Sequence, residues 1–211
     1  MGKLTLTVFC LMAATTLQAQ TWEIGGFGGY GYSFNNTVKA PGGDADVRTK
    51  PGKVFGVVGG GDTHNYWSGE VRYLYRYSDL EVSGGGQKAS LAGHTHIIHA
   101  DFLGHFKPKG SRTRPFIAFG AGIKVLQGTG VESSSQALGN KVALTATKEV
   151  LGVVDVGAGV KIDVKKHLRL RLEFRDYISA APSKVFTPAP GATLGGVWND
   201  MIGTAGLSYI W

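Results

Sequence analysis

The sequence of 211 residues predicts an all-β protein, an eight-stranded antiparallel up-and-down transmembrane β-barrel. Between Leu168 and Arg175, leucine or phenylalanine alternates with arginine or glutamate, so an extended strand would carry one apolar and one charged face. Segments with this two-residue period recur along the chain, and the connections between them alternate between short and longer. After position 20 there is no run of about 18 apolar residues, which excludes a helical membrane protein.

The N-terminus is typical of a secretory signal peptide, which we expect over residues 1–19. It has one basic residue, Lys3, then a short apolar core, then small and polar residues up to Ala19. Cys10 is the only cysteine and lies inside the apolar core, so we expect no lipid modification there. Cleavage would leave 20–211 as a barrel domain without a thiol, and hence without a disulfide or a Cys-ligated metal.

The first four expected strands each alternate between two kinds of side chain. Trp22–Phe34 interleaves glycine with aromatic residues, and glycine permits sharp curvature in a strand. Lys53–Gly61 follows a polar segment rich in Gly, Pro and Asp. Tyr66–Leu80 sets tyrosine, tryptophan and valine against charged residues, and Leu91–Phe106 sets isoleucine and phenylalanine against histidine and aspartate.

The last four expected strands continue the pattern. Pro115–Gln127 has isoleucine, phenylalanine and valine on one face, and Glu149–Val164 alternates valine with aspartate, glycine and lysine. His167–Tyr177 carries the clearest alternation, and Asp200–Trp211 ends on an aromatic residue. We expect irregular external loops at 35–52, 128–148 and 178–199, and short periplasmic turns near 62–65, 107–114 and 163–167, on the same side as both termini.

Three motifs resemble the OmpA-like family of small outer-membrane β-barrel proteins: RPFIAFGAGIKV at Arg114–Val125, the aromatic–Arg–Tyr strands GEVRYLYRYSD and LRLEFRDY, and the terminal GLSYIW. The resemblance spans the whole expected barrel domain. It implies a location in the outer membrane of a Gram-negative bacterium, contact with outer-membrane lipid, and recognition by the barrel assembly machinery. The last of these would read alternate residues of the final strand, Leu207, Tyr209 and Trp211.

In the expected barrel the charged faces point into the lumen. The inward charges would be four acids, Glu70, Asp101, Asp155 and Glu173, and seven bases, Arg72, Arg76, Lys124, Lys161, Arg169, Arg171 and Arg175. Eight strands enclose little more than their own side chains, so these groups must pair or bind trapped water. The set therefore favours a salt-bridged plug that stiffens the barrel. The alternative is a narrow pore that prefers anions, because the bases outnumber the acids.

Other candidate sites fail on their context. Gly26, Gly28 and Gly31 spell a dinucleotide-binding motif, but no helix is expected to follow them. His94 and His96 would share one face of a strand while His99 points to the other, so they cannot converge on a metal. We expect neither a cofactor nor a metal.

A lipid-modifying barrel enzyme is a less favoured alternative. It would need a serine activated by a histidine at the lipid boundary. Here the late strand reads His167-Leu168-Arg169 where such enzymes carry His-x-Ser, and Ser208 has no histidine near it in sequence. We therefore expect a protein that is not an enzyme.

Three classes of function remain to compare. The leading hypothesis is a structural or surface-interaction barrel, in which the external loops bind an unknown extracellular ligand. The second is the narrow anion-preferring pore. A soluble lipocalin-like carrier is disfavoured, because a soluble barrel that exposed these tyrosine, leucine and valine faces would aggregate. The formal charge of +7, or +6 after loss of Lys3, is spread along an exported chain, so nucleic acid is not an expected partner.

Overall fold

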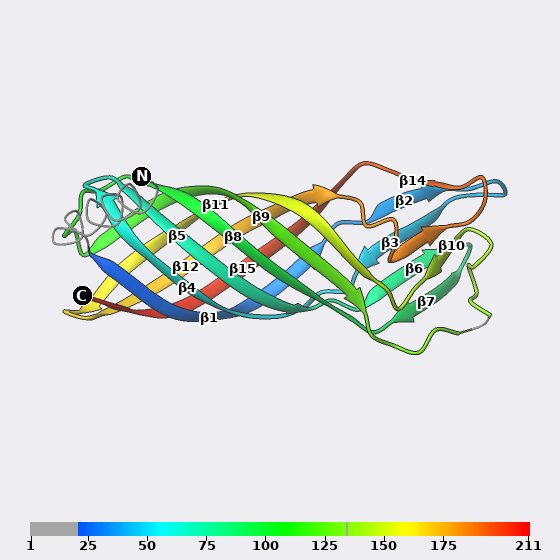
Figure 1. The fold of residues 1–211 in the computed structure, drawn as a ribbon, viewed down its shortest axis with the longest axis horizontal. Coiled ribbons are helices and arrows are strands. Elements are labelled where there is room, and N and C mark those ends of the chain that lie inside the picture. The colour runs from blue at the N-terminus through cyan, green and yellow to red at the C-terminus, as the bar shows by residue number, and fades with distance from the viewer. Residues whose placement is uncertain (1–20, 134) are drawn as a thin grey trace, which may run out of the picture.

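The computed structural model describes residues 21–133 and 135–211, in which eight long antiparallel strands close into a barrel (Figure 1). The expected signal peptide, 1–19, lies outside the described residues. Around the barrel the order is β1-β15-β12-β11-β9-β8-β5-β4, so each strand pairs with its neighbours among the barrel strands in chain order, and the first pairs with the last. The strands are β1 (Trp22–Ser33), β4 (Gly52–His64), β5 (Trp67–Tyr77), β8 (Gly93–His105), β9 (Thr113–Gly128), β11 (Lys148–Lys165), β12 (Leu168–Ala180) and β15 (Val197–Ile210). The predicted up-and-down barrel is confirmed.

Both ends of the barrel domain meet at one end of the molecule. Trp22 donates its backbone N–H to the carbonyl of Trp211 at 3.1 Å, and Trp211 donates in return at 3.2 Å. The tight connections β4–β5, β8–β9 and β11–β12 lie at this same end (Figure 1). We call it the terminal end.

The opposite end is an ordered β-structured extension, and the prediction of irregular loops there was wrong. Five short strands form a sheet in the order β14-β2-β3-β6-β7, and a separate pair, β10 with β13, lies beside it (Figure 1). Their bounds are β2 (Asn36–Lys39), β3 (Ala45–Thr49), β6 (Leu80–Gly84), β7 (Gln87–Leu91), β10 (Val142–Leu144), β13 (Phe186–Pro188) and β14 (Thr193–Leu194).

The extension forms because its segments carry apolar residues at alternate positions. Ala45 and Val47 alternate with the charged Asp46 and Arg48. Because β3 pairs with β6, the apolar Ala45 and Val47 share a face with Leu80 and Val82. The buried residues make a hydrophobic core that continues to the top of the barrel through Leu126 and Trp198: Val38, Ala45, Val47, Leu80, Val82, Leu91, Leu126, Leu138, Val142, Leu144, Val185, Phe186 and Trp198. What the sequence indicated as one strand, 66–80, is therefore divided at Ser78 and Asp79 into β5 and β6.

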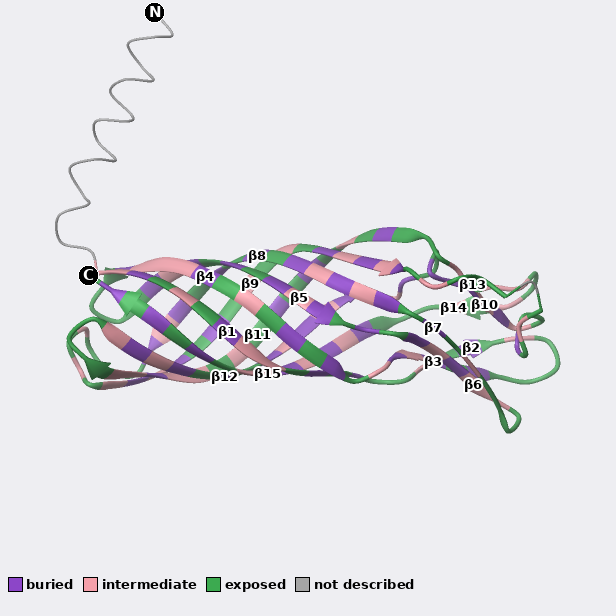
Figure 2. Ribbon diagram, turned by 90° about the horizontal axis from the view of Figure 1, so that it is seen from below, coloured by how far each residue is buried: buried purple, intermediate pink, exposed green. Residues whose placement is uncertain are grey.

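Burial alternates along the barrel strands, so that exposed and buried residues form bands in Figure 2. On β12 the exposed positions are apolar, with Leu172 43% and Phe174 57% exposed, whereas Arg171, Glu173 and Arg175 are buried. The outer wall is thus apolar and the inside is charged. Among the described residues, no helix is long and apolar enough to cross a membrane.

Inward glycines make room for the large interior side chains. A Cβ on Gly120 would lie 2.1 Å from Oδ1 of Asp101, and a Cβ on Gly157 would lie 2.5 Å from Cγ of Arg175. Both contacts are closer than real Cβ atoms approach, so a larger residue would push the ion-paired side chains apart.

Candidate functional site: the ion-paired interior

The centre of the lumen is crossed by ion pairs between β5 and β12. In the closed order of eight strands these two lie four positions apart, on opposite sides of the barrel. Glu70 on β5 accepts from Nη2 of Arg171 at 2.7 Å and from Nη2 of Arg175 at 2.9 Å. Glu173 on β12 accepts from Arg72 across the lumen. All five side chains of this central network are at most 3% exposed.

A second ionic layer lies toward the terminal end and is centred on Glu23 of β1. This carboxylate accepts hydrogen bonds from Lys161 at 2.9 Å, Arg169 at 2.9 Å and Arg171 at 2.6 Å. The sequence prediction included the three bases but not Glu23, which lies within the Gly- and aromatic-rich first strand. Nearby, Arg114 donates to both carboxylate oxygens of Asp62 at 2.9 Å.

A third ionic layer lies toward the extension and is centred on Asp200. Arg76 donates to its Oδ1 at 2.7 Å and Lys124 to its Oδ2 at 2.5 Å. Ser33 also bonds to this carboxylate, and the Lys124 ammonium lies 5.7 Å from the centre of the Trp198 ring. Asp200 was assigned only to the start of the last strand, so the sequence prediction left Arg76 and Lys124 without this partner.

An apolar layer separates the central network from the Asp200 layer. Along β5 the inward residues run Glu70, Arg72, Leu74 and Arg76, so that a leucine interrupts the charges. Leu74 belongs to a buried cluster drawn from every barrel strand except β9: Phe27, Val54, Val58, Leu74, Ile97, Val153, Tyr177 and Ile202. Beyond the Asp200 layer, the core of the extension forms a second apolar layer. Charged and apolar layers therefore alternate along the lumen.

Asp101 and Asp155 meet His99 beside the central network. Nδ1 of His99 lies 2.7 Å from Oδ1 of Asp101 and 3.1 Å from Oδ1 of Asp155, and Arg175 contacts the other oxygen of each carboxylate at 3.0 and 2.8 Å. The three donor atoms lie within 4.8 Å of one another, close enough to surround a metal ion. However, the Arg175 guanidinium already contacts both carboxylates, so the set fits an ion-paired cluster better than a cation site.

The other two histidines of the candidate metal set lie on the outer wall. The rings of His94 and His96 are 4.9 Å apart and pack against Tyr75. The three histidines therefore point to both sides of β8, as the alternation predicts. Sequence reasoning missed Asp155 as a partner of His99, because β8 and β11 are separated by β9 and approach only through the lumen.

The buried charges balance more closely than the sequence suggested. Among the described residues the buried Lys and Arg are Arg72, Arg76, Arg114, Lys124, Lys161, Arg169, Arg171 and Arg175, and the buried Asp and Glu are Glu23, Asp62, Glu70, Asp101, Glu149, Asp155, Glu173 and Asp200. The two buried sets are therefore equal in number, eight bases and eight acids, and Glu149 accepts from the backbone N–H groups of Lys184 and Val185. The excess of three positive charges, on which the anion-preferring pore was based, is absent because four acids and one base near the strand ends had not been assigned to the interior.

A serine–histidine contact exists, but within the lumen. Ser68 Oγ lies 2.8 Å from Nε2 of His105, and both residues are buried. Nδ1 of His105 has no hydrogen-bond partner among the described residues, so no acid orients the ring as a catalytic triad requires. Ser208 is also buried, and its Oγ has no partner in the described part of the chain.

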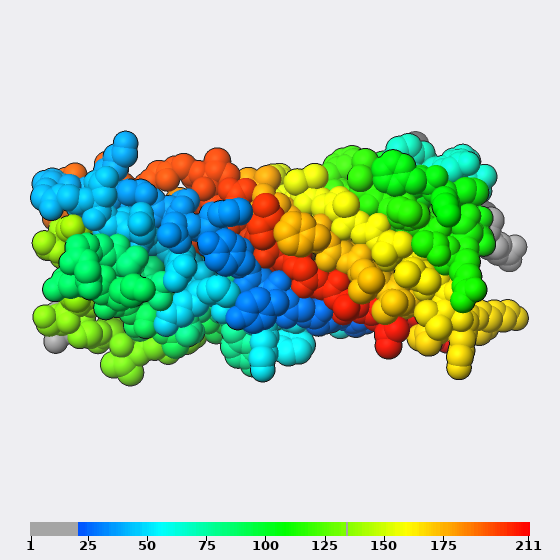
Figure 3. All heavy atoms as spheres, turned by 180° about the vertical axis from the view of Figure 1, so that it is seen from behind, coloured from blue at the N-terminus to red at the C-terminus, as the bar shows by residue number. Residues whose placement is uncertain are grey.

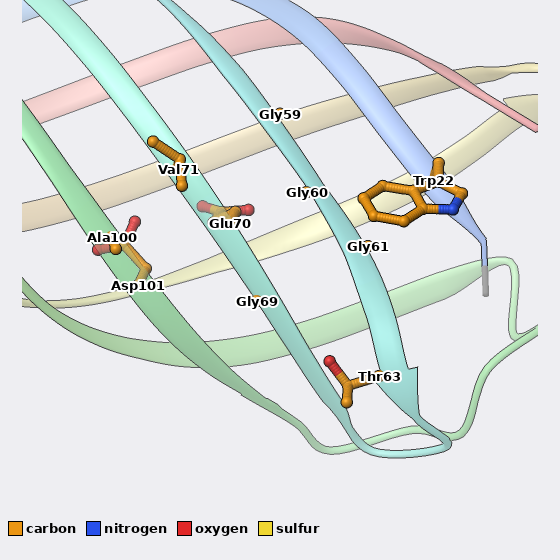
Figure 4. A pocket seen from close by; sticks show the side chains of 10 residues that line it. All are labelled: Trp22, Gly59, Gly60, Gly61, Thr63, Gly69, Glu70, Val71, Ala100 and Asp101. Carbon is orange, nitrogen blue, oxygen red and sulfur yellow. The ribbon is translucent and has the colours of Figure 1, made fainter. Parts of the chain in front are cut away.

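The outer wall has a shallow groove near the terminal end, shown in Figure 4. Gly59 and Gly61 of β4 and Gly69 of β5 leave the backbone bare between the Trp22 ring and Val71. An added Cβ on Gly59 would meet only a carbonyl oxygen at 4.0 Å, so this position could hold a larger side chain without a steric clash. Glu70 and Asp101 contribute to the groove but form their ion pairs on the lumenal side.

The three residues of the expected assembly signal lie on the outer wall of β15 and its end. Leu207, Tyr209 and Trp211 are exposed, and the Tyr209 ring stacks between those of His167 and Trp211 at 5.4 and 5.9 Å. Their recognition by the assembly machinery stays a prediction.

Comparison with known proteins gives a family and a fold. A family model described as "Outer membrane protein beta-barrel domain" matches residues 2–209. The outer membrane protein OprG from Pseudomonas aeruginosa has a similar structure, with a TM-score of 0.63, 10% identity, and coverage of 92% of this chain and 96% of that one. Neisserial surface protein A gives a TM-score of 0.54 at 12% identity, with coverage of 91% and 99%. No curated protein matches the sequence.

Proposed function

Because the chain belongs to the outer membrane protein β-barrel domain family, we propose that it is an outer-membrane barrel with a closed lumen, which acts by holding its β-structured extension outside the cell for contact with an external partner. In this arrangement the terminal end faces the periplasm, and the short connections and both ends of the barrel domain lie there. The proposal includes neither conduction nor catalysis.

The alternation of ionic and apolar layers in the lumen carries this proposal. An ion that entered would have to separate the Glu70–Arg171 and Glu70–Arg175 pairs, which join opposite walls, and then cross the apolar layer at Leu74 and Tyr177. An apolar constriction expels water and so blocks ions even where the backbone leaves space. The lumen is therefore better suited to stiffening the wall than to transport.

The extension supports a role outside the cell. Its strands share one buried core with Leu126 and Trp198 of the barrel, so its surface has a fixed shape relative to the wall. A binding surface that is ordered before contact loses less conformational entropy on binding than a flexible loop does. Function on such a scaffold resides in its exposed residues, which leave no general motif in sequence.

The orientation is testable with short protease-cleavable tags. Gly43, in the β2–β3 turn, and Gly86, in the β6–β7 turn, have positive φ angles of 111° and 79° and lie at exposed tips. Gly110, with φ of 87°, lies in the β8–β9 turn at the terminal end. Protease added to intact cells should cut tags at Gly43 and Gly86, and should cut a tag at Gly110 only after the outer membrane is permeabilised. Cleavage at Gly110 alone would invert the proposed orientation.

The closed lumen is testable in planar bilayers. The refolded barrel should give no conductance steps, because the ionic and apolar layers block the lumen. A general porin inserted into the same membrane is the positive control, and a heat-dependent shift on an SDS gel verifies folding of the sample. Reproducible steps from the folded protein would contradict the closed lumen and would favour a pore instead.

A further inference from the structure

Two neighbouring turns at the terminal end present four exposed bases, which we call the basic rim. Lys107 and Arg112 belong to the β8–β9 turn, Lys165 is the last residue of β11, and Lys166 lies in the turn that follows it. The turns adjoin because β9 pairs with β11, and the backbone N–H of Asp163 donates to the carbonyl of Arg112 at 2.8 Å. Figure 3 shows the green 107–112 region and the yellow 163–167 region side by side at one end.

The charge of the basic rim is not compensated within the described part of the chain. None of its four side chains forms an ion pair there. Asp163 is the one carboxylate in residues 106–113 and 163–167, and it binds Arg169 at 2.6 Å instead. The nearest interior base, Arg114, is likewise bound to Asp62. The rim therefore offers four free cations to an external anion.

The position of the basic rim relative to the apolar wall indicates what that anion is. Lys107 directly follows Phe106, which is 68% exposed, and Lys165 directly follows the exposed Val164. Trp67 stacks on Phe102 near the same end, with ring centres 4.9 Å apart. Aromatic residues of transmembrane barrels gather where hydrocarbon meets the lipid headgroups. Cations just beyond them lie at the depth of the lipid phosphates, and long Lys and Arg side chains reach that depth with their charged ends.

We propose that the basic rim binds the phosphate groups of anionic phospholipids in the leaflet at the terminal end. All four side chains of the rim are exposed, so it would select lipids by net charge and not by headgroup shape. The inference rests on the proposed placement in a membrane but not on any role of the extension. It gives the two ends different tasks, with lipid contact at one and display at the other.

Brominated lipids provide a direct test, because bromine quenches nearby tryptophans. Trp22, Trp67 and Trp211 lie at the terminal end, whereas Trp198 is fully buried beneath the extension. The full refolded protein is placed in phosphatidylcholine vesicles that contain a minor fraction of brominated phosphatidylglycerol or, in parallel, brominated phosphatidylcholine. Since one basic residue near an anionic surface favours binding by a factor of about five, we expect roughly a fivefold or greater preference for phosphatidylglycerol, reduced by added salt.

Two variants test whether the lipid preference comes from the basic rim. Changing Lys107, Arg112, Lys165 and Lys166 to glutamine should abolish the preference, whereas the same change at Lys39, Lys50, Lys88 and Lys141 of the extension should preserve it. The SDS gel shift verifies that both variants fold. Both leaflets of these vesicles have the same composition, so the result does not depend on how the protein is oriented in cells. A negative result would therefore contradict only the lipid inference, and the proposed function would still be tested by the tag and bilayer experiments. Equal quenching by the two lipids would overturn the inference, and rim-dependent sedimentation with peptidoglycan would then assign the rim to the cell wall.

Discussion

Replacing Glu70 with glutamine should lower the free energy of unfolding by about 3 kcal/mol, the lower end of the cost of breaking a buried ion pair. Glu70 receives hydrogen bonds from both Arg171 and Arg175, and its side chain is 2% exposed. Glutamine keeps the size but removes the charge, so the two guanidinium groups lose part of their compensation in a site without bulk water. Both retain Glu173 as a partner, which is why we expect the lower end of the range.

The measurement is a denaturant titration of the barrel in lipid vesicles, followed by tryptophan fluorescence and by the gel shift. Glu81→Gln is the matched control, because Glu81 pairs with a partly exposed Arg48 in the extension and should cost less than about 1 kcal/mol. If the two substitutions destabilised the barrel equally, the central network would not be a main source of its stability.

Leu172→Arg should destabilise the membrane-inserted barrel by about 2–4 kcal/mol, the cost of a charge on the lipid-facing wall near the midplane. Leu172 lies near the middle of the outward face of β12, between the inward-pointing Arg171 and Glu173. The cost falls toward the interfaces, so the size of the effect reports the depth of this residue as well as the direction in which it points.

Val131→Arg supplies the control for the second substitution. Val131 is 96% exposed in the segment between β9 and β10, beyond the barrel wall, and a charge there should leave the unfolding free energy unchanged within about 0.5 kcal/mol. Equal tolerance of the two arginines would mean that the outer face of β12 does not meet hydrocarbon.

The barrel itself could be predicted because each of its strands alternates between two kinds of side chain over many residues. The extension could not, because its strands have two to five residues and lie among glycines and prolines that favour loops. The alternation of Ala45 and Val47 with Asp46 and Arg48 was present, but a pattern this short occurs by chance in loops. Its meaning depends on pairing with β6, which is more than 30 residues away in the chain.

The interior site was predicted in its middle and missed at its edges. Glu70, Arg72, Arg171, Glu173 and Arg175 lie in the centres of strands, where alternation decides the face. Asp62, Arg114 and Asp200 lie near strand ends. The expected strands ended just before Asp62, began just after Arg114 and began at Asp200 itself, so alternation could not assign these residues to the inner face. Glu23 lies near the start of a strand whose glycines carry no polarity signal, and only the closed barrel brings it to its three bases.

The position of Glu23 on the first strand has a consequence for the order of folding. Its partners Lys161, Arg169 and Arg171 follow it by 138 to 148 residues, and it reaches them when β1 docks on β15. Contacts of such long sequence separation form late, since a large loop must first be closed. A sheet that is still open between its first and last strands therefore carries three cations that lack this carboxylate. Partly closed intermediates are disfavoured, and closure of the seam and completion of the ionic interior should occur as one cooperative event.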